Sequence, residues 1–266
     1  MSGTKFFDYN YALQAFGGAV IASSNDTKKW YAFDGNKRTR WITSGEATDG
    51  DAVSIERDFQ TNRVVRCLFV YDTNISDIAF YYWNGTAYVE FQDGVNCEII
   101  KSTDYKHIYV EAAANITTAK IKITGSATLT ANQEKYIGLF HSFKLLGALA
   151  YPIALNPTRN LEQVKHKLDN AKYFIIDKGE AAEFSLKIKS HINQADIDLL
   201  EALKERKAEF YIWPNGADES QFTYSFAPYR FKDLYKVCLV DKFSPEYTGN
   251  YYRAGLNDTL KMVEVD

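Results

Sequence analysis

Short segments in which apolar and polar residues alternate recur through the first 147 residues of this 266-residue chain. In residues 52–59, Val53, Ile55 and Phe59 are separated by polar residues, which is the two-residue period of a strand with one buried face. Further segments that we expect to be strands span residues 63–71, 78–83, 87–91, 97–100, 107–112, 118–123 and 137–146. Many short strands separated by turn signals are typical of an antiparallel β-sandwich.

The pair Asn84-Gly85 lies between two of these segments. It predicts a hairpin, because a type I′ turn needs two successive residues with positive φ and Asn-Gly satisfies both.

The composition permits a folded chain and argues against nucleic-acid binding. Apolar residues make up 46% of the sequence, enough for a substantial core. The net charge is −3, so the chain lacks the overall basic field of a nucleic-acid binder. One short basic cluster, Lys37, Arg38 and Arg40, is either a solvated loop or a phosphate site, and the solvated loop is favoured.

The three cysteines, Cys67, Cys97 and Cys238, are widely spaced. Their number and spacing fit neither a zinc site nor a disulfide framework, so we expect free thiols and synthesis in a reducing compartment. The N-terminus carries polar and acidic residues too early for a secretory leader. No apolar run approaches the ~20 residues that span a bilayer, so no membrane insertion is expected.

After residue 157 the pattern changes to that of an α+β domain. Residues 148–157 are apolar and contain two prolines, which favours an ordered connector over a flexible tether. The clearest helix signal begins at residues 193–196, and its apolar face consists of Ile197, Leu200 and Leu203 together with Leu199. The spacing from Leu161 to Leu168 suits either a helix or a segment that lies along a sheet. We therefore expect domains at residues 1–147 and 158–266.

Residues 22–24 read ASS, and residues 32–41, which begin eight positions after Ser24, read AFDGNKRTRW. This segment is similar to the opening of discoidin domains, also called factor 5/8 type C domains. The resemblance extends over residues 1–147 and implies a galactose-binding-like jelly roll.

The resemblance places the 32–41 loop near the family's ligand site. The carbohydrate-binding residues that it implies are Trp30, Tyr31, Asn36, Arg38 and Arg40. Trp30 can serve equally as a core residue, whereas Trp41 is expected to fill the core. Calcium-binding members of the family use the Asp of this loop and a Glu in the closing strand. Here Asp34 and Thr39 would supply oxygen ligands, but Ser142 stands where the Glu would be, so no cofactor or, at most, calcium is expected.

The C-terminal half resembles phage distal-tail and tail-tip proteins, through its helix and a strand that ends in WPNG at Gly216. That resemblance implies a β-sandwich with one packed helix, a homo-oligomeric ring and other tail proteins as partners. The leading hypothesis is therefore a structural protein of a bacteriophage tail, assembled in the bacterial cytoplasm and released by lysis. Its N-terminal domain would contact glycans on the host surface or neighbouring subunits.

Motifs that carry catalysis are absent from the sequence. There is no GxSxG, no GxxxxGK[ST] and no HExxH, so we expect no enzymatic activity. His141 on the closing strand is expected to be a hydrogen-bonded structural residue. The alternatives to the tail protein are a stand-alone carbohydrate-binding protein with a scaffold domain and, less favoured, an accessory subunit of a hydrolase.

Overall fold

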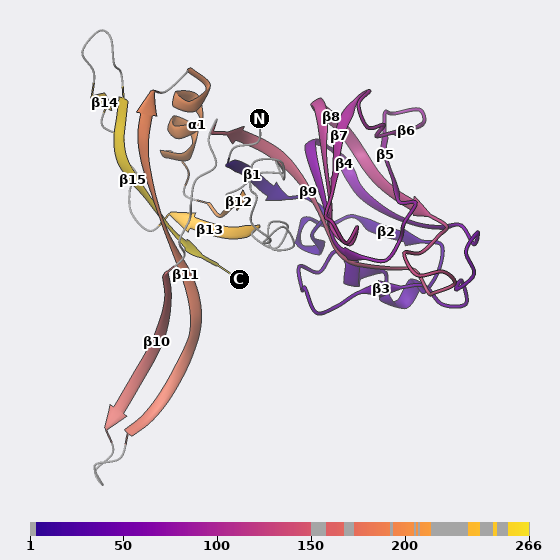
Figure 1. The fold of residues 1–266 in the computed structure, drawn as a ribbon, viewed down its shortest axis with the longest axis horizontal. Coiled ribbons are helices and arrows are strands. Elements are labelled where there is room, and N and C mark those ends of the chain that lie inside the picture. Colours follow the sequence, from indigo (N-terminus) through magenta and orange to yellow (C-terminus); the bar gives the residue numbers. More distant parts are fainter. Residues whose placement is uncertain are drawn as a thin grey trace. The chain divides into compact units, whose positions relative to one another are not determined.

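The protein is mainly β, as expected from the sequence, in a computed structural model of the whole chain (Figure 1). The structure describes residues 4–149, 158–167, 173–191, 194–204, 206, 208–213, 234–239, 247–248 and 255–265. Of these, Asp8–Leu145 belong to one compact unit, the N-terminal unit. Residues 4–7, 146–149 and the described residues from 158 onward belong to a second, the C-terminal unit. The expected connector lies outside the described residues from position 150 onward.

The N-terminal unit is built mostly from strands. In chain order its elements are β1 (Lys5–Asn10), η1 (Gln14–Phe16), β2 (Ala19–Ala22), η2 (Asp26–Ala32), β3 (Trp41–Ile42), β4 (Val53–Thr73), β5 (Ala79–Trp83), β6 (Tyr88–Glu90), β7 (Cys97–Lys101), β8 (Ile108–Gly125) and β9 (Tyr136–Ala148). The boundary between the two units falls within β1 and β9.

Two long strands, β4 and β8, pair with each other along most of their length, and the two halves of each strand have different further partners. The first half of β4 pairs with β2 and with the last part of β8, which also pairs with β5. The second half of β4 pairs with β9 and with the first part of β8, which also pairs with β7. Register shifts after Asp58 and after Val65 separate the two halves. The sequence predicts each of these long strands as two short ones, because a bulge interrupts the alternation without ending the strand.

The buried apolar side chains of the N-terminal unit gather in one core. Val53, Ile55 and Phe59 are buried in it, which confirms the predicted alternation. Trp41 is also buried there, and its indole N–H donates to the carbonyl of Ser24 at 3.0 Å, so the expected core role of Trp41 is confirmed.

The predicted hairpin at Asn84-Gly85 is present, with a longer turn than expected. Trp83 pairs with Tyr88, so four residues form the connection. The Asn84 side chain accepts the backbone N–H groups of Thr86 and Ala87, both at 2.9 Å. Of the two expected positive φ angles, only that of Gly85 occurs, so this is not a type I′ turn.

The C-terminal unit combines antiparallel strands with one described α-helix. Its elements are β10 (Thr158–Lys167), β11 (Tyr173–His191), α1 (Gln194–Lys204), β12 (Phe210–Trp213), β13 (Tyr235–Leu239), β14 (Tyr247–Thr248) and β15 (Gly255–Glu264). The predicted helix is confirmed, and Leu199 and Leu203 are buried in the core of this unit. The 161–168 segment, for which helix and strand were both open, is mostly the strand β10.

Candidate functional site

The loop between η2 and β3 closes on itself through the Asp34 carboxylate. Its Oδ1 atom accepts the backbone N–H of Asn36 at 2.8 Å, and its Oδ2 atom accepts the Thr39 hydroxyl at 2.7 Å. The Asn36 side chain in turn accepts the backbone N–H of Arg38 at 2.9 Å. Both groups expected to bind calcium are thus hydrogen-bonded to each other, and calcium binding stays a prediction. Within the described ranges, no three His, Cys, Asp or Glu side chains gather into a metal site.

The aromatic residues predicted for sugar binding lie on η2. Trp30 is half-buried and packs against the core, with its ring 5.1 Å from the Arg57 guanidinium and 6.5 Å from the Phe33 ring. Tyr31 is 41% exposed. Neither residue lines the cavity described next.

A cavity of about 400 Å³ opens in the N-terminal unit, beside the 34–40 loop. Its buried lining residues are Tyr71, His107, Gly138 and Leu139, and its more exposed lining residues are Lys37, Asp72, Asp104 and Lys106. We call this cavity the Tyr71 pocket. It combines an apolar floor with donors and acceptors at its rim.

Three segments that are distant in sequence form the pocket because of strand register. Val70 pairs with Ile108, and Tyr71 pairs with Leu139. The end of β4, the start of β8 and the start of β9 therefore lie at the same edge of the sheet. A Cβ atom on Gly138 would lie 2.8 Å from the carbonyl oxygen of Tyr71, so glycine permits the close approach of β9 to β4 at the pocket floor.

Asp72, at the rim of the pocket, is held in place by Arg40 of the 34–40 loop. The Arg40 guanidinium forms an ion pair with the Asp72 carboxylate and lies 4.6 Å from the centre of the Tyr136 ring. Burial raises the pKa of the Tyr136 hydroxyl, and the negative charge of Asp72 raises it further. The backbone N–H of Asp72 donates to Nδ1 of His107 at 3.2 Å, which places the imidazole proton on Nε2.

The loop between β7 and β8 is fixed by its own side chains. Asp104 accepts the Ser102 hydroxyl at 2.6 Å and the backbone N–H of Lys106 at 3.2 Å. Ser102 also accepts the backbone N–H of His107 at 3.0 Å. Burial acts to raise the pKa of Asp104, but these hydrogen bonds outweigh it and lower that pKa, and the charge of Lys106 acts in the same direction. The pocket wall is therefore preorganised.

The structure thus connects only part of the predicted site to the pocket. Arg40 holds its rim, and Lys37 from the same basic cluster lines it. Arg38 is exposed, and no described residue forms a hydrogen bond or ion pair with its side chain. The remaining pocket residues, which lie at the end of β4, before β8 and in β9, were not predicted from the sequence. The available signal was the position of these polar residues. Asp72 directly follows the apolar segment 63–71, and residues 104–106 directly precede the segment 107–112. This signal does not tell which strands pair with each other.

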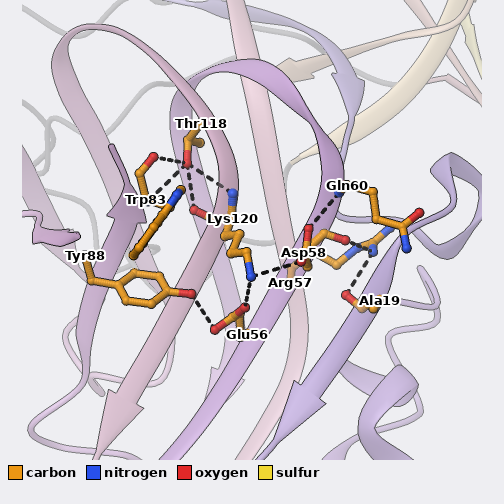
Figure 2. Close-up of polar contacts among 9 residues, drawn as sticks. All are labelled: Ala19, Glu56, Arg57, Asp58, Gln60, Trp83, Tyr88, Thr118 and Lys120. Carbon is orange, nitrogen blue, oxygen red and sulfur yellow. Dashed lines mark hydrogen bonds and ion pairs between the residues drawn. The ribbon is translucent and has the colours of Figure 1, made fainter. Parts of the chain in front are cut away.

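A second polar cluster lies on the outer face of the sheet that contains β5 and β6. Figure 2 shows the Tyr88 hydroxyl and the Lys120 ammonium both directed at the Glu56 carboxylate. Lys120 also contacts Asp58, with 3.1 Å between Nζ and Oδ2. Burial and the hydrogen bond to Glu56 raise the pKa of Tyr88. The ammonium group of this cluster, on Lys120, is therefore already paired with two carboxylates.

The expected structural role of His141 is confirmed. It is 5% exposed, and Asn10 Nδ2 lies 2.5 Å from its Nδ1 atom. Burial and then the charge of Lys37 lower its pKa to about 3, so the ring is neutral at physiological pH. Of the cysteines, Cys67 and Cys97 are buried free thiols and Cys238 is a half-buried one. Among the described helices, none has the length and apolar character needed to cross a membrane.

Comparison with known proteins gives structural similarities for about half of the chain. CpGH89CBM32-6 of Clostridium perfringens has a TM-score of 0.40 and 17% identity, over 51% of this chain and 99% of its own. Chitosan-binding module 1 of a Paenibacillus sp. IK-5 chitosanase/glucanase has a TM-score of 0.40 and 17% identity, over 52% of this chain and 100% of its own. The family 32 carbohydrate-binding module of C. perfringens NanJ, solved with galactose, has a TM-score of 0.38 and 16% identity, over 53% of this chain and 99% of its own.

No family model and no curated protein matches the sequence. The three structural similarities fall on the N-terminal half, for which the sequence analysis states a galactose-binding-like resemblance. At this identity and TM-score they assign no ligand to this chain. The resemblance of the C-terminal half to phage tail proteins gains no support from these comparisons and stays a prediction.

Proposed function

We propose that the N-terminal unit is a non-catalytic carbohydrate-binding unit and that the Tyr71 pocket holds the sugar. The observation that carries this proposal is a cavity with an apolar floor, at Tyr71 and Leu139, and a rim of charged donors and acceptors. This is the alternative function of the sequence analysis, now attached to a particular site.

The pocket has the properties that a sugar needs. Its volume of about 400 Å³ lies within the range of ligand sites, roughly 300–1,000 Å³. A sugar presents hydroxyl groups that both donate and accept, together with apolar C–H faces. The rim offers carboxylates as acceptors and ammonium groups as donors, and the loops that carry them are held in place by the contacts described above. Little ordering would then be needed on binding.

The proposal is tested by filling the pocket. Leu139→Phe adds a ring at the floor, where the cavity provides space, so the fold should tolerate it. We expect binding to a glycan array to fall at least about tenfold, with the unfolding temperature nearly unchanged. Leu129→Phe makes the same change at a residue that is 37% exposed and outside the pocket, and it should leave binding intact.

Two results would contradict the proposal. The first is that the full chain binds no glycan, and the second is that Leu139→Phe binds glycan as tightly as the wild type does. The second result would place the sugar site elsewhere, for instance at Tyr31 and Arg38 of the predicted set.

A second function, assembly through the C-terminal unit, is favoured by one feature of the backbone. From Tyr173 to Ala182, β11 pairs with β10, and the pairing with β15 begins at Glu183. Figure 1 shows β10 and this part of β11 side by side as a two-stranded ribbon. Among the described strands no third one pairs with the ribbon. Two-stranded ribbons are marginal alone, and their free edges pair readily with another chain.

We therefore keep the homo-oligomer of the sequence analysis as a proposal, and the tail role and virion localisation as predictions that rest on it. Mass photometry of the full chain should show a closed oligomer. Replacing Val164 and Ile175 with proline removes one backbone donor from each of the two strands. This double variant should be a monomer. A wild-type chain that is monomeric at micromolar concentration would rule this second function out.

A further inference from the structure

We infer that the ligand of the Tyr71 pocket is an acidic sugar, one that carries a carboxylate or sulfate group. This inference rests on the proposed function and specifies the chemical class of the ligand. It follows from how the charged groups of the pocket are paired.

The two carboxylates of the rim already have partners within the protein. Asp72 forms its ion pair with Arg40, and the Tyr136 hydroxyl lies 3.4 Å from the other carboxylate oxygen. Asp104 accepts the Ser102 hydroxyl and the backbone N–H of Lys106. A ligand would have to compete with these contacts to use either carboxylate as its main anchor.

The two ammonium groups of the rim are in the opposite situation. Lys37 and Lys106 both line the pocket, and neither forms an ion pair or side-chain hydrogen bond with any residue in the described part of the chain. The Lys37 Nζ atom lies 5.7 Å from the centre of the Tyr71 ring. The charge of Lys106 acts on Asp104 without forming an ion pair with it. Both ammonium groups are therefore available to a ligand.

The charge balance of the site agrees with this pairing. Lys37, Arg40 and Lys106 carry three positive charges, and Asp72 and Asp104 carry two negative ones. His107 is neutral when its Nδ1 atom accepts the N–H of Asp72. The outer-face cluster of Figure 2 is the contrasting case, because Lys120 there lies between two carboxylates. Unpaired positive charge in a concave, partly buried site attracts an anion more strongly than on an open surface.

Because the two available cations are lysines, we expect little selectivity between different anionic groups. An ammonium group is a compact point charge and lacks the planar fork with which arginine matches a carboxylate. We therefore expect the pocket to recognise the negative charge of the sugar, with carboxylate and sulfate both accepted.

The experiment compares matched sugars on the full chain. Glucose and galactose, their uronic acids and their 6-sulfates are presented on one array, at low salt and at about 150 mM salt, where the screening length is about 8 Å. We expect the acidic forms to bind at least about tenfold more tightly than the neutral forms at low salt, with a smaller preference at the higher salt concentration.

Two lysine variants locate the preference. In Lys37→Gln/Lys106→Gln the acidic and neutral sugars should bind equally. Lys122→Gln is a matched control, because the Lys122 Nζ atom lies 5.4 Å from the centre of the Tyr88 ring on the outer sheet face, outside the pocket. It should keep the wild-type preference.

The outcomes separate this inference from the proposed function. Equal binding of neutral and acidic sugars, or a preference that survives in the double variant, overturns the inference and leaves the proposed function standing. Binding of no sugar at all overturns both.

Discussion

Arg57 shows how a single residue organises the N-terminal unit. It occupies an inward position of β4 and is 0% exposed, yet none of the described carboxylates forms an ion pair with it. Instead the guanidinium donates to five backbone carbonyls, those of Ala12, Leu13, Gly17, Ala19 and Asp58. Burial lowers the pKa of Arg57 to about 10, so the group remains charged at physiological pH. The hydrogen bonds therefore fix the path of the chain from η1 to β2.

Replacing Arg57 with Met should be strongly destabilising. The change leaves several buried carbonyls without a donor, and each such group costs roughly 1–3 kcal/mol, so we expect a loss of at least about 3 kcal/mol in the free energy of unfolding. Urea unfolding of the full chain, followed by tryptophan fluorescence, measures it.

Arg38→Met is the matched control for this experiment. Arg38 is exposed, so the same substitution should change the stability by no more than about 0.5 kcal/mol. Equal stability of the two variants would show that the Arg57 contacts do not hold this segment.

At the scale of elements, acidic side chains join loops that are distant in sequence. Asp77, after β4, accepts the backbone N–H groups of Ser126 and Ala127 and the Ser126 hydroxyl, at distances from 2.6 to 3.0 Å. Burial acts to raise the pKa of Asp77, but these hydrogen bonds outweigh it and lower that pKa. The carboxylate therefore connects the loop before β5 to the end of β8.

This pKa shift predicts a loss of stability in acid. The folded-state pKa of Asp77 is below its ordinary value, so its contribution is present at neutral pH and is lost as the pH falls through the folded-state value, below about pH 4. Asp77→Asn should lower the unfolding temperature at pH 7 and should reduce the fall in that temperature between pH 5 and 3. Calorimetry across this range measures both.

Asp51→Asn serves as the control for the acid experiment. Asp51 accepts one backbone N–H, that of Thr48, at 3.2 Å. If Asp77→Asn and the wild type lose stability in parallel as the pH falls, Asp77 does not contribute to the acid sensitivity.

At the scale of the whole molecule, the two compact units carry different proposals. The pocket and its charged rim lie entirely within Asp8–Leu145, so the sugar-binding proposal depends on this unit alone. The ribbon of β10 and β11 lies entirely in the C-terminal unit. Sugar binding and assembly can therefore be tested independently, and the failure of one leaves the other intact.

Features that depend on neighbours along the chain could be predicted from the sequence. The alternation from Val53 to Phe59, the hairpin at Asn84 and the helix Gln194–Lys204 follow from local periodicity and turn chemistry. The core role of Trp41 agrees with the motif in which it lies. Most of the fold class could be predicted from such local signals.

Which of the charged loops lie together depends on how the strands pair across the fold. Tyr71, His107 and Leu139 form one pocket because the registers of β4 with β8 and of β4 with β9 bring them together. Strand pairing is a choice among many partners of similar local pattern, so it is settled by the packing of the whole sheet and not by any one segment. Of the residues predicted to bind sugar, or in the same basic cluster, Lys37 and Arg40 are at the pocket. The other pocket residues lie on β4, before β8 and on β9, and no local sequence pattern indicates that these segments are close in space.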